Sequence, residues 1–380
     1  MKTCRVGSRQ IGIQLKLTAF SSPDGLILQY KRKMITRSEH AVQIIGSDIE
    51  MNKSYMTWQT QLKQAIRTPE ALCQYLGLDS SIWQEGAQTG HQLFPIRVPL
   101  AYARRIQPST PEDPLLKQIL PLSKETDAIQ GFITDPLEEK EHSPRPGLIH
   151  KYRNRVLLIA SGGCAINCRY CFRRHFPYQE NVQSRSEWHD TLDYVQQHPE
   201  ITEVILSGGD PLLSTDARLF DLVSCIEQIP HVIRLRIHTR LPVVIPDRVT
   251  QALCERLSDS RLQCVMVLHI NHPAEIDDAV AMAAQQLGNA GVTVLNQSVL
   301  LRGINDDAHV LAALSERLFA SGIMPYYLHV LDPVAGAAHF DVPDSEAVAI
   351  MDTLRVHLAG FLVPKLVREI PGKLSKTPLY

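Results

Sequence analysis

Hydrophobic positions from residue 155 onward alternate between two spacings. Short apolar runs with the length of buried strands occupy 155–160, 203–207, 232–238, 262–269, 292–299 and 325–331. Longer segments with helical spacing lie between and after them, at 187–197, 216–228, 247–258, 275–290, 307–321 and 344–358. Six strand–helix units in succession predict a parallel sheet with right-handed crossovers. Six units, where a closed barrel of this type has eight, indicate an open, partial barrel of the α/β class.

The chain before this region has a different pattern. Helical spacing begins at Trp58, and Thr68 followed by Pro69 predicts the start of a second helix that runs to Leu76. Residues 89–150 mix short helices with irregular chain. We therefore expect a mostly helical region at 51–150, a partial barrel at 151–340, and a C-terminal helix with a tail at 341–380.

Residues 1–50 follow neither pattern. They are rich in Lys, Arg and Ser and have no sustained period. A transit peptide is one interpretation, but the acidic residues Asp24, Glu39 and Asp48 argue against it. We favour an atypical extension that precedes a natural start at Met51 or Met56, and expect it to pack poorly.

Composition restricts the class of protein. The 380 residues are 44% hydrophobic and 21% charged, with a net charge of −1, as in ordinary globular proteins. Such a charge gives no global field that would recruit nucleic acid or an anionic membrane. No apolar run approaches the roughly 20 residues of a membrane span. Eight cysteines without a signal peptide favour a reducing compartment, so we expect a cytoplasmic protein.

Three cysteines follow the first predicted barrel strand in the pattern CxxxCxxC. They are Cys164, Cys168 and Cys171, and arginines stand among them and directly after them. Three thiols in one short loop can surround a compact inorganic centre, and neighbouring arginines favour the thiolate. Thiolates suit zinc or an iron–sulfur cluster.

Three interpretations of this loop remain open. A [4Fe–4S] cluster on three cysteines leaves one iron free for another ligand, and the spacing favours it. Structural zinc needs a fourth ligand, for which the candidates are His175, Cys225, Cys254 and Cys264. Inert or redox-active thiols are the third interpretation.

Several separate motifs resemble one family. CxxxCxxC at a strand end is the signature of radical S-adenosylmethionine (SAM) enzymes. HKYRNRVLL, CRYCFRRHF, SGGDPL, HINHP, NQSVLLRGIND and SKTPL are similar to lysine 2,3-aminomutases, and more narrowly to the EpmB branch, which prepares β-lysine for modification of elongation factor P. The similarity runs from about Trp58 to the C-terminus. It implies a radical SAM partial (β/α)6 barrel that isomerises L-α-lysine to (R)-β-lysine with a [4Fe–4S] cluster, SAM and pyridoxal 5′-phosphate (PLP).

The resemblance also implies roles for individual residues. Cys164, Cys168 and Cys171 would hold the cluster, and the segment Ser207, Gly208, Gly209 and Asp210 would bind SAM. PLP would be attached to the catalytic Lys376, with Lys151 and Arg155 at its phosphate and Gln297 at its ring. Arg173 would pair with the substrate carboxylate, and Asp332 and Glu369 with its ε-ammonium.

Each of these residues also has an ordinary interpretation. A glycine pair is most often only a turn, and a lysine near a chain end is most often solvated. Arg155 would then form a strand-entry ion pair, Asp332 would be a turn former, and Glu369 a surface carboxylate. Lys373 is the second candidate for PLP attachment.

The sequence departs from the family at several places. Lys151 stands where the family has arginine, and Glu369 stands where it has aspartate. The chain stops at Tyr380 without the cysteine-bearing segment that follows in the aminomutases, so we expect no such zinc site and a different oligomer. His269, Asn271 and His272 resemble metal ligands by type, and we treat them as structural.

The partners that the resemblance implies are lysine, an electron donor such as a flavodoxin or ferredoxin, elongation factor P and its lysyl ligase. A homo-oligomer is also possible. Two rival functions remain. The first is a radical SAM reaction on a different amino acid, and the second is a zinc-stapled, factor-binding protein without catalysis.

Overall fold

The structure is a computed structural model that describes residues 57–79, 84–181 and 185–380, together with four short strands before them. The chain divides into two units, Met1–Tyr55 and Met56–Tyr380. In the first unit, β1 (Arg5–Val6) pairs with β2 (Arg9–Gln10), and β3 (Ala19–Ser22) pairs with β4 (Gly25–Leu28), both antiparallel. The expectations of poor packing at 1–50 and of a start at Met51 or Met56 lie outside the described residues.

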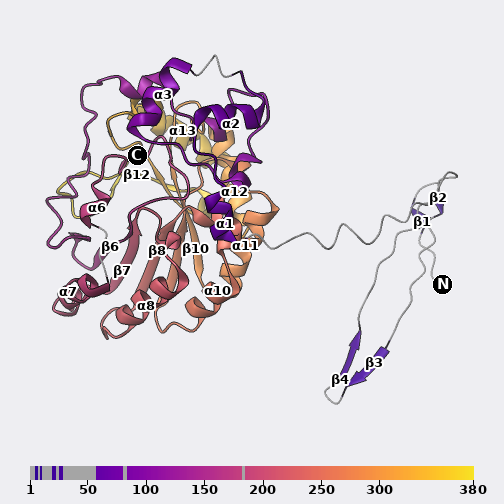
Figure 1. Cartoon of the computed structure of the whole chain (residues 1–380), viewed down its shortest axis with the longest axis vertical. Coiled ribbons are helices and arrows are strands. Elements are labelled where there is room, and N and C mark those ends of the chain that lie inside the picture. The colour runs from indigo at the N-terminus through magenta and orange to yellow at the C-terminus, as the bar shows by residue number, and fades with distance from the viewer. Residues whose placement is uncertain are drawn as a thin grey trace. The chain divides into compact units, whose positions relative to one another are not determined.

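One sheet organises the second unit. Its strands follow the order β13-β12-β11-β10-β9-β8-β7-β6-β5, and those from β6 to β12 run parallel (Figure 1). Their bounds are β5 Leu148–Tyr152, β6 Arg155–Ser161, β7 Glu203–Gly208, β8 Arg234–Thr239, β9 Gln263–Leu268, β10 Thr293–Val299, β11 Met324–His329, β12 Lys365–Arg368 and β13 Thr377–Pro378. The strands predicted from residue 155 onward are β6 to β11, so the predicted partial barrel is confirmed.

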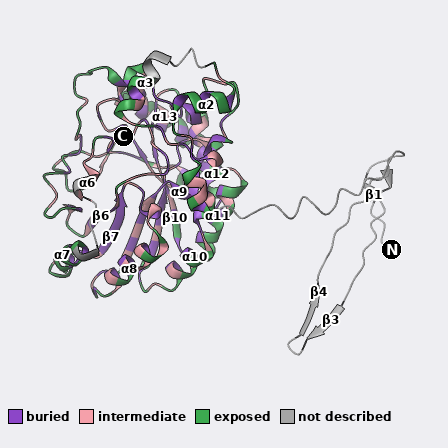
Figure 2. Ribbon diagram, in the orientation of Figure 1, coloured by how far each residue is buried: buried purple, intermediate pink, exposed green. Residues whose placement is uncertain are grey.

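Helices connect these strands and cover the outer side of the sheet (Figure 1). Those of the barrel are α7 (Arg185–Gln196), α8 (Asp216–Glu227), α10 (Gln251–Ser258), α11 (Asp278–Asn289), α12 (Ala308–Ala320) and α13 (Asp344–His357). Each corresponds to a predicted helix. Exposed residues lie on the outward side of these helices, and the strands beneath them are mostly buried or half-buried (Figure 2).

Helices α10 and α11 begin later than predicted, because other local structures use their first residues. Pro246–Arg248 forms a 3-10 turn, and α10 begins only after Thr250 accepts from the Leu253 amide. Pro273–Glu275 forms a second such turn, and Asp277 then caps α11. Both starts are side-chain caps of the expected kind.

The N-terminal part of the second unit is helical and irregular, as predicted. It holds α1 (Trp58–Lys63), α2 (Pro69–Leu76), α3 (Gln84–Leu93), α4 (Leu100–Ala103) and α5 (Pro114–Lys117). Thr68 caps α2, and Gly77 ends it in the left-handed conformation at φ 66°. Buried side chains of this part, among them Tyr102 and Leu115, belong to the same core as the barrel strands.

The C-terminal tail differs from the prediction. After α13 it forms β12 and β13, which extend the sheet by one parallel and one antiparallel strand. At the other edge, β5 pairs antiparallel with β6 and was also missed. Both edge additions bring charged side chains to the interior of the barrel. In the described residues, no helix has the length and apolarity of a membrane span.

Candidate functional site

A cavity of about 620 Å³ occupies the interior of the partial barrel. Every site residue predicted from the sequence lines it. These are Lys151, Arg155, Cys164, Cys168, Cys171, Arg173, Ser207, Gly208, Gly209, Asp210, Gln297, Asp332, Glu369 and Lys376. Residues separated by more than 200 positions thus share one space, and their individual roles stay predictions.

The parallel sheet explains most of this convergence. The cysteines follow β6, the Ser207–Asp210 segment ends β7, and Asp332 follows β11, so these residues meet at the carboxyl edge of the sheet. Two residues do not follow this rule. Arg155 is the first residue of β6 and Gln297 lies inside β10, so the cavity extends along the strands beyond the carboxyl edge.

Close backbone packing holds the cysteine loop against β7. The Gly209 amide donates to Ser161 O at 2.8 Å, and the Asp210 amide donates to Gly163 O at 2.7 Å. A Cβ on Gly209 would collide with the Gly163 backbone. The SGGD glycines therefore allow two loops to touch, a structural need in addition to the predicted approach of a ligand.

Buried ion pairs anchor the same loop from the N-terminal side. The Arg169 side chain is fully buried, and its Nε donates to Glu125 Oε1 at 2.8 Å. Arg174 Nη2 donates to Glu125 Oε2 at 2.6 Å. Arg97 Nη1 adds a hydrogen bond to Cys164 O at 2.9 Å. The arginines next to the cysteines therefore hold the loop in place, in addition to adding positive charge beside the thiols.

Burial dominates the protonation of the thiols. It raises the pKa of Cys164 well above the ordinary value, and it raises the pKa of Cys171 to about 11, although Arg173 and Arg174 act in the opposite direction. The neighbouring arginines do act toward the thiolate at Cys171, as expected, but burial outweighs them and leaves its pKa raised. A metal centre that binds here must displace protons, as thiolate sites do.

The donor set suits a cluster better than a single zinc ion. None of the proposed fourth zinc ligands, His175, Cys225, Cys254 and Cys264, lines the cavity. Among the described residues, no three His, Cys, Asp or Glu side chains have the geometry of a single-ion site. Cluster cysteines bind different irons and need not converge on one point, so the three thiols of this cavity fit a cluster.

The Asp210 carboxylate, predicted as part of a SAM site, is engaged within the protein. It accepts from Thr239 Oγ1 at 2.6 Å and from the backbone amides of Arg240 and Leu241 at 2.8 and 2.9 Å. These bonds connect the ends of β7 and β8. The segment Ser207–Asp210 nevertheless lines the cavity.

Arg173, predicted to bind a substrate carboxylate, already holds one. Its Nε and Nη2 donate to the two oxygens of Glu139 at 2.8 and 2.7 Å, and its Nη1 donates to Ser207 Oγ at 3.1 Å. This is the bidentate geometry in which arginine recognises carboxylates. Glu139 was not singled out in the sequence, because nothing near it in the chain shows this pairing.

Glu369 joins the two lysines at the other end of the cavity. Its Oε2 lies 2.8 Å from Lys376 Nζ, and its Oε1 lies 3.3 Å from Lys151 Nζ. Burial alone would raise the pKa of Glu369, but the two ammonium groups lower it to about 2. Lys376 also lies over the Tyr327 ring. Lys376 is thus not a solvated tail residue, whereas Lys373 is exposed.

Asp332 has the opposite electrostatic surroundings. Burial and the nearby charge of Glu369 raise its pKa to about 7, which Lys376 only partly offsets. Two carboxylates in one cavity therefore have pKa values far apart, an arrangement that is frequent at functional sites. A cationic ligand group placed beside Asp332 would favour its ionised form.

Three histidines of the cavity were not predicted as site residues. His329 is buried, and His238 and His269 are half-buried. The Nε2 atom of each has no hydrogen-bond partner among the described residues. Burial and nearby cations lower the pKa of His269 to about 4, so its imidazole is neutral. His269 had been assigned a structural role. Asn271 and His272 do have one, because they bind the buried Glu275.

Comparisons with known proteins agree with this site. The family model described as Radical SAM superfamily matches residues 158–314. The L-lysine 2,3-aminomutase of Haemophilus influenzae is 52% identical, over 84% of this chain and 94% of the relative. That of Escherichia coli K12 is 52% identical over 85% and 94%, and that of Clostridium subterminale is 38% identical over 85% and 77%.

The radical SAM domain implies a [4Fe–4S] cluster and SAM, and lysine 2,3-aminomutases are isomerases that depend on PLP. Cys164, Cys168 and Cys171 are the residues of this chain that fit the cluster. From its cavity, its thiols and its relatives, we conclude that this chain belongs to the radical SAM lysine 2,3-aminomutase family.

Proposed function

We propose that the protein converts L-α-lysine into (R)-β-lysine, with PLP attached to Lys376. One observation carries the proposal: the cysteine triplet, Lys376, a carboxylate-binding arginine and two carboxylates line the same cavity. When bound, the cluster with SAM supplies a carbon radical, and PLP activates the substrate amine. The remaining tasks belong to the side chains of this chain.

The residues fit PLP on two grounds. Lys376 is a cavity amine close to other charged groups, as a lysine with this task requires. Arg155 lies at the same sheet edge as Lys151 and has no carboxylate partner among the described residues, so its guanidinium is available to a phosphate. Gln297 lines the same cavity.

Substrate binding would exchange carboxylates on Arg173. Glu139 occupies the arginine fork, and the lysine carboxylate would take the same two donors. At the opposite end of the substrate, Asp332 and Glu369 would hold the ε-ammonium. Glu369 already pairs with the ammonium groups of Lys151 and Lys376, so the ε-ammonium of the substrate could take the place of one of them.

A ligand-filled cavity would also protect the reaction. The neutral imidazoles of His238, His269 and His329 lack hydrogen-bond partners among the described residues and would gain them from bound groups. A filled, closed site excludes water and oxygen from a radical. These residues orient and enclose the substrate, and the cofactors carry the difficult chemistry.

From the similarity to the EpmB branch, we also propose how the cell uses the product. The β-lysine would serve the modification of elongation factor P by its lysyl ligase in the cytoplasm. A flavodoxin or ferredoxin would deliver the electron that starts each radical cycle. The enzyme would act as a homo-oligomer.

The decisive experiment is anaerobic reconstitution with iron, sulfide, SAM and PLP, followed by chiral analysis of the products from L-lysine. We expect (R)-β-lysine. Parallel incubations with glutamate and arginine test the rival of a different amino acid, and preferential turnover of either would replace lysine as the substrate. A colourless protein that binds zinc in a fixed ratio and has no PLP absorbance would support the non-catalytic alternative.

A further inference from the structure

Arg240 is a buried arginine to which the proposed function gives no task. It follows β8 directly and its side chain is 6% exposed. Its backbone amide donates to Asp210 Oδ2 at 2.8 Å. The backbone of Arg240 is therefore held next to the place where the SGGD segment contacts the cysteine loop.

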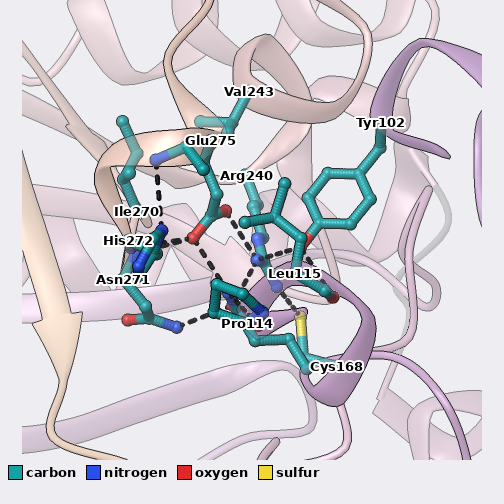
Figure 3. A network of polar contacts seen from close by, with 12 residues as sticks. Tyr102, Pro114, Leu115, Cys168, Arg240, Val243, Ile270, Asn271, His272 and Glu275 are labelled. Carbon is teal, nitrogen blue, oxygen red and sulfur yellow. Dashed lines mark hydrogen bonds and ion pairs between the residues drawn. The ribbon is translucent and has the colours of Figure 1, made fainter. Parts of the chain in front are cut away.

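The guanidinium divides its donors between a carboxylate and a cysteine. Nη2 donates to Glu275 Oε2 and to Gln118 Oε1, both at 2.7 Å. Nη1 lies within hydrogen-bonding distance of Cys168 Sγ, as Figure 3 shows. Nε has no partner among the described residues.

The acceptor that orients Arg240 is itself immobile. Glu275 is completely buried, and its Oε1 accepts from the Asn271 amide at 2.8 Å and from the His272 amide at 3.2 Å. Gln118 Nε2 donates to the same oxygen at 3.2 Å. Glu275, after β9 (Figure 3), and Gln118, in the N-terminal region, thus hold the guanidinium in one orientation.

We propose that Arg240 is a positioning residue that holds Cys168 as a cluster ligand and raises the reduction potential of the cluster. The [4Fe–4S]²⁺ cluster accepts one electron from a low-potential one-electron donor and becomes [4Fe–4S]⁺. The added negative charge strengthens an N–H donor bond to a ligand sulfur. Hydrogen bonds to the sulfurs are among the protein's means of setting cluster potentials.

The Arg240–Glu275 pair is neutral as a whole, but its two members are not equivalent. The cation contacts Cys168, whereas the bonds of the carboxylate go to Arg240, Gln118 and backbone amides. The nearer charge therefore dominates at the sulfur. This inference rests on the cluster at the three cysteines and is independent of the substrate and of PLP.

A buried Arg–Glu pair could instead serve only to stabilise the fold. The reduction potential of the cluster distinguishes this role from the proposed one, because a purely structural pair would not change it. The test variant is Arg240→Gln/Glu275→Gln, which removes both charges together and leaves no buried carboxylate unpaired. Arg256→Gln/Glu227→Gln is the matched control, because that Arg–Glu pair lies outside the cavity lining. Each protein is reconstituted anaerobically, and the midpoint potential is measured by an EPR-monitored redox titration without SAM.

We expect the test variant to have a lower midpoint potential than the wild type. At the wild-type midpoint, its ratio of reduced to oxidised cluster should fall about tenfold, which is about 59 mV for one electron. The control variant should keep the wild-type potential. A test variant with full iron content and an unchanged potential would overturn the proposal.

A second measurement uses the wild-type protein and does not depend on how the variant folds. Protein labelled with ¹⁵N-arginine is reduced, and pulsed EPR is used to search for a ¹⁵N coupling to the cluster. The proposal requires that coupling, and its absence sinks the proposal. Iron and sulfide analysis of the wild type comes first, because a protein without a cluster would refute both this inference and the proposed reaction, whereas a failure only of the coupling refutes this inference alone.

Discussion

The two ends of the cavity hold their charged groups in different ways. At the cysteine end, Arg169 and Glu125 have 0% side-chain exposure, and their partners are fixed parts of the fold. At the lysine end, Lys376 and Glu369 are 20% and 17% exposed and pair with each other through the C-terminal tail. The first end resembles a core, and the second holds charges that a ligand can exchange.

Under the proposed function, this difference separates contacts that must be permanent from contacts that must change in each catalytic cycle. A cluster needs ligands in a constant arrangement, and buried pairs that are costly to break provide it. A substrate must enter and leave, so its binding groups need partners that can be replaced. Under the proposed function, Glu369 on the two half-buried lysines is such a replaceable partner.

The most severe change at the cysteine end is Cys168→Ala. It removes one of the three proposed cluster ligands and also the sulfur that faces Arg240, so we expect no assembled cluster and lysine turnover at background. Iron and sulfide analysis with anaerobic assays will measure both. Cys254→Ala on α10 is the control and should keep both. Full isomerisation by the Cys168 variant would refute the assignment.

The corresponding change at the lysine end is Lys376→Ala. We expect complete loss of covalent PLP and of turnover, while the cluster content stays at the wild-type level because the ends are built independently. Borohydride reduction followed by peptide mass spectrometry locates the attachment. Lys373→Ala should still carry PLP on Lys376, and a label found on Lys373 would exchange the roles of the two lysines.

The fixed character of the cysteine end can be tested through stability. Glu125→Gln leaves Arg169 and Arg174 buried without their shared carboxylate, which should cost about 3–5 kcal/mol in the free energy of unfolding. Denaturant titration of the protein without cofactors measures it. Glu346→Gln, at an exposed pair with Arg302, should leave the unfolding midpoint unchanged. Equal midpoints for both variants would contradict the comparison.

The smallest effect concerns pH at the lysine end. Because its pKa is raised to about 7, Asp332 is neutral below that pH and ionised above it, and only the ionised form attracts an ammonium group. We expect kcat/KM for lysine to fall by up to about tenfold for each pH unit below 7. Asp332→Asn should lower kcat/KM at high pH and flatten this dependence, whereas the exposed Asp341→Asn should not. If kcat/KM of the wild type does not change between pH 6 and 8, Asp332 does not bind the ammonium group of the substrate.

Most of the fold could be predicted from local patterns in the sequence. The strand from residue 155 and the helix that begins at Pro69 could be predicted, because apolar spacing and caps act within a few residues. The strands β12 and β13 could not, because they are short and form only by pairing with a sheet that already exists. The starts of α10 and α11 were misplaced because a proline turn precedes each one.

The sequence by itself determined the order of strands and helices, the cysteine triplet with its spacing, and the family resemblance that pointed to Lys376. The tertiary structure alone decided the partners: Glu139 for Arg173, Glu369 for both lysines, and Glu275 with Cys168 for Arg240. The physical reason is distance along the chain. Lys151 and Glu369 are 218 positions apart, and a charge so remote in sequence leaves no local pattern until the sheet brings the two ends together.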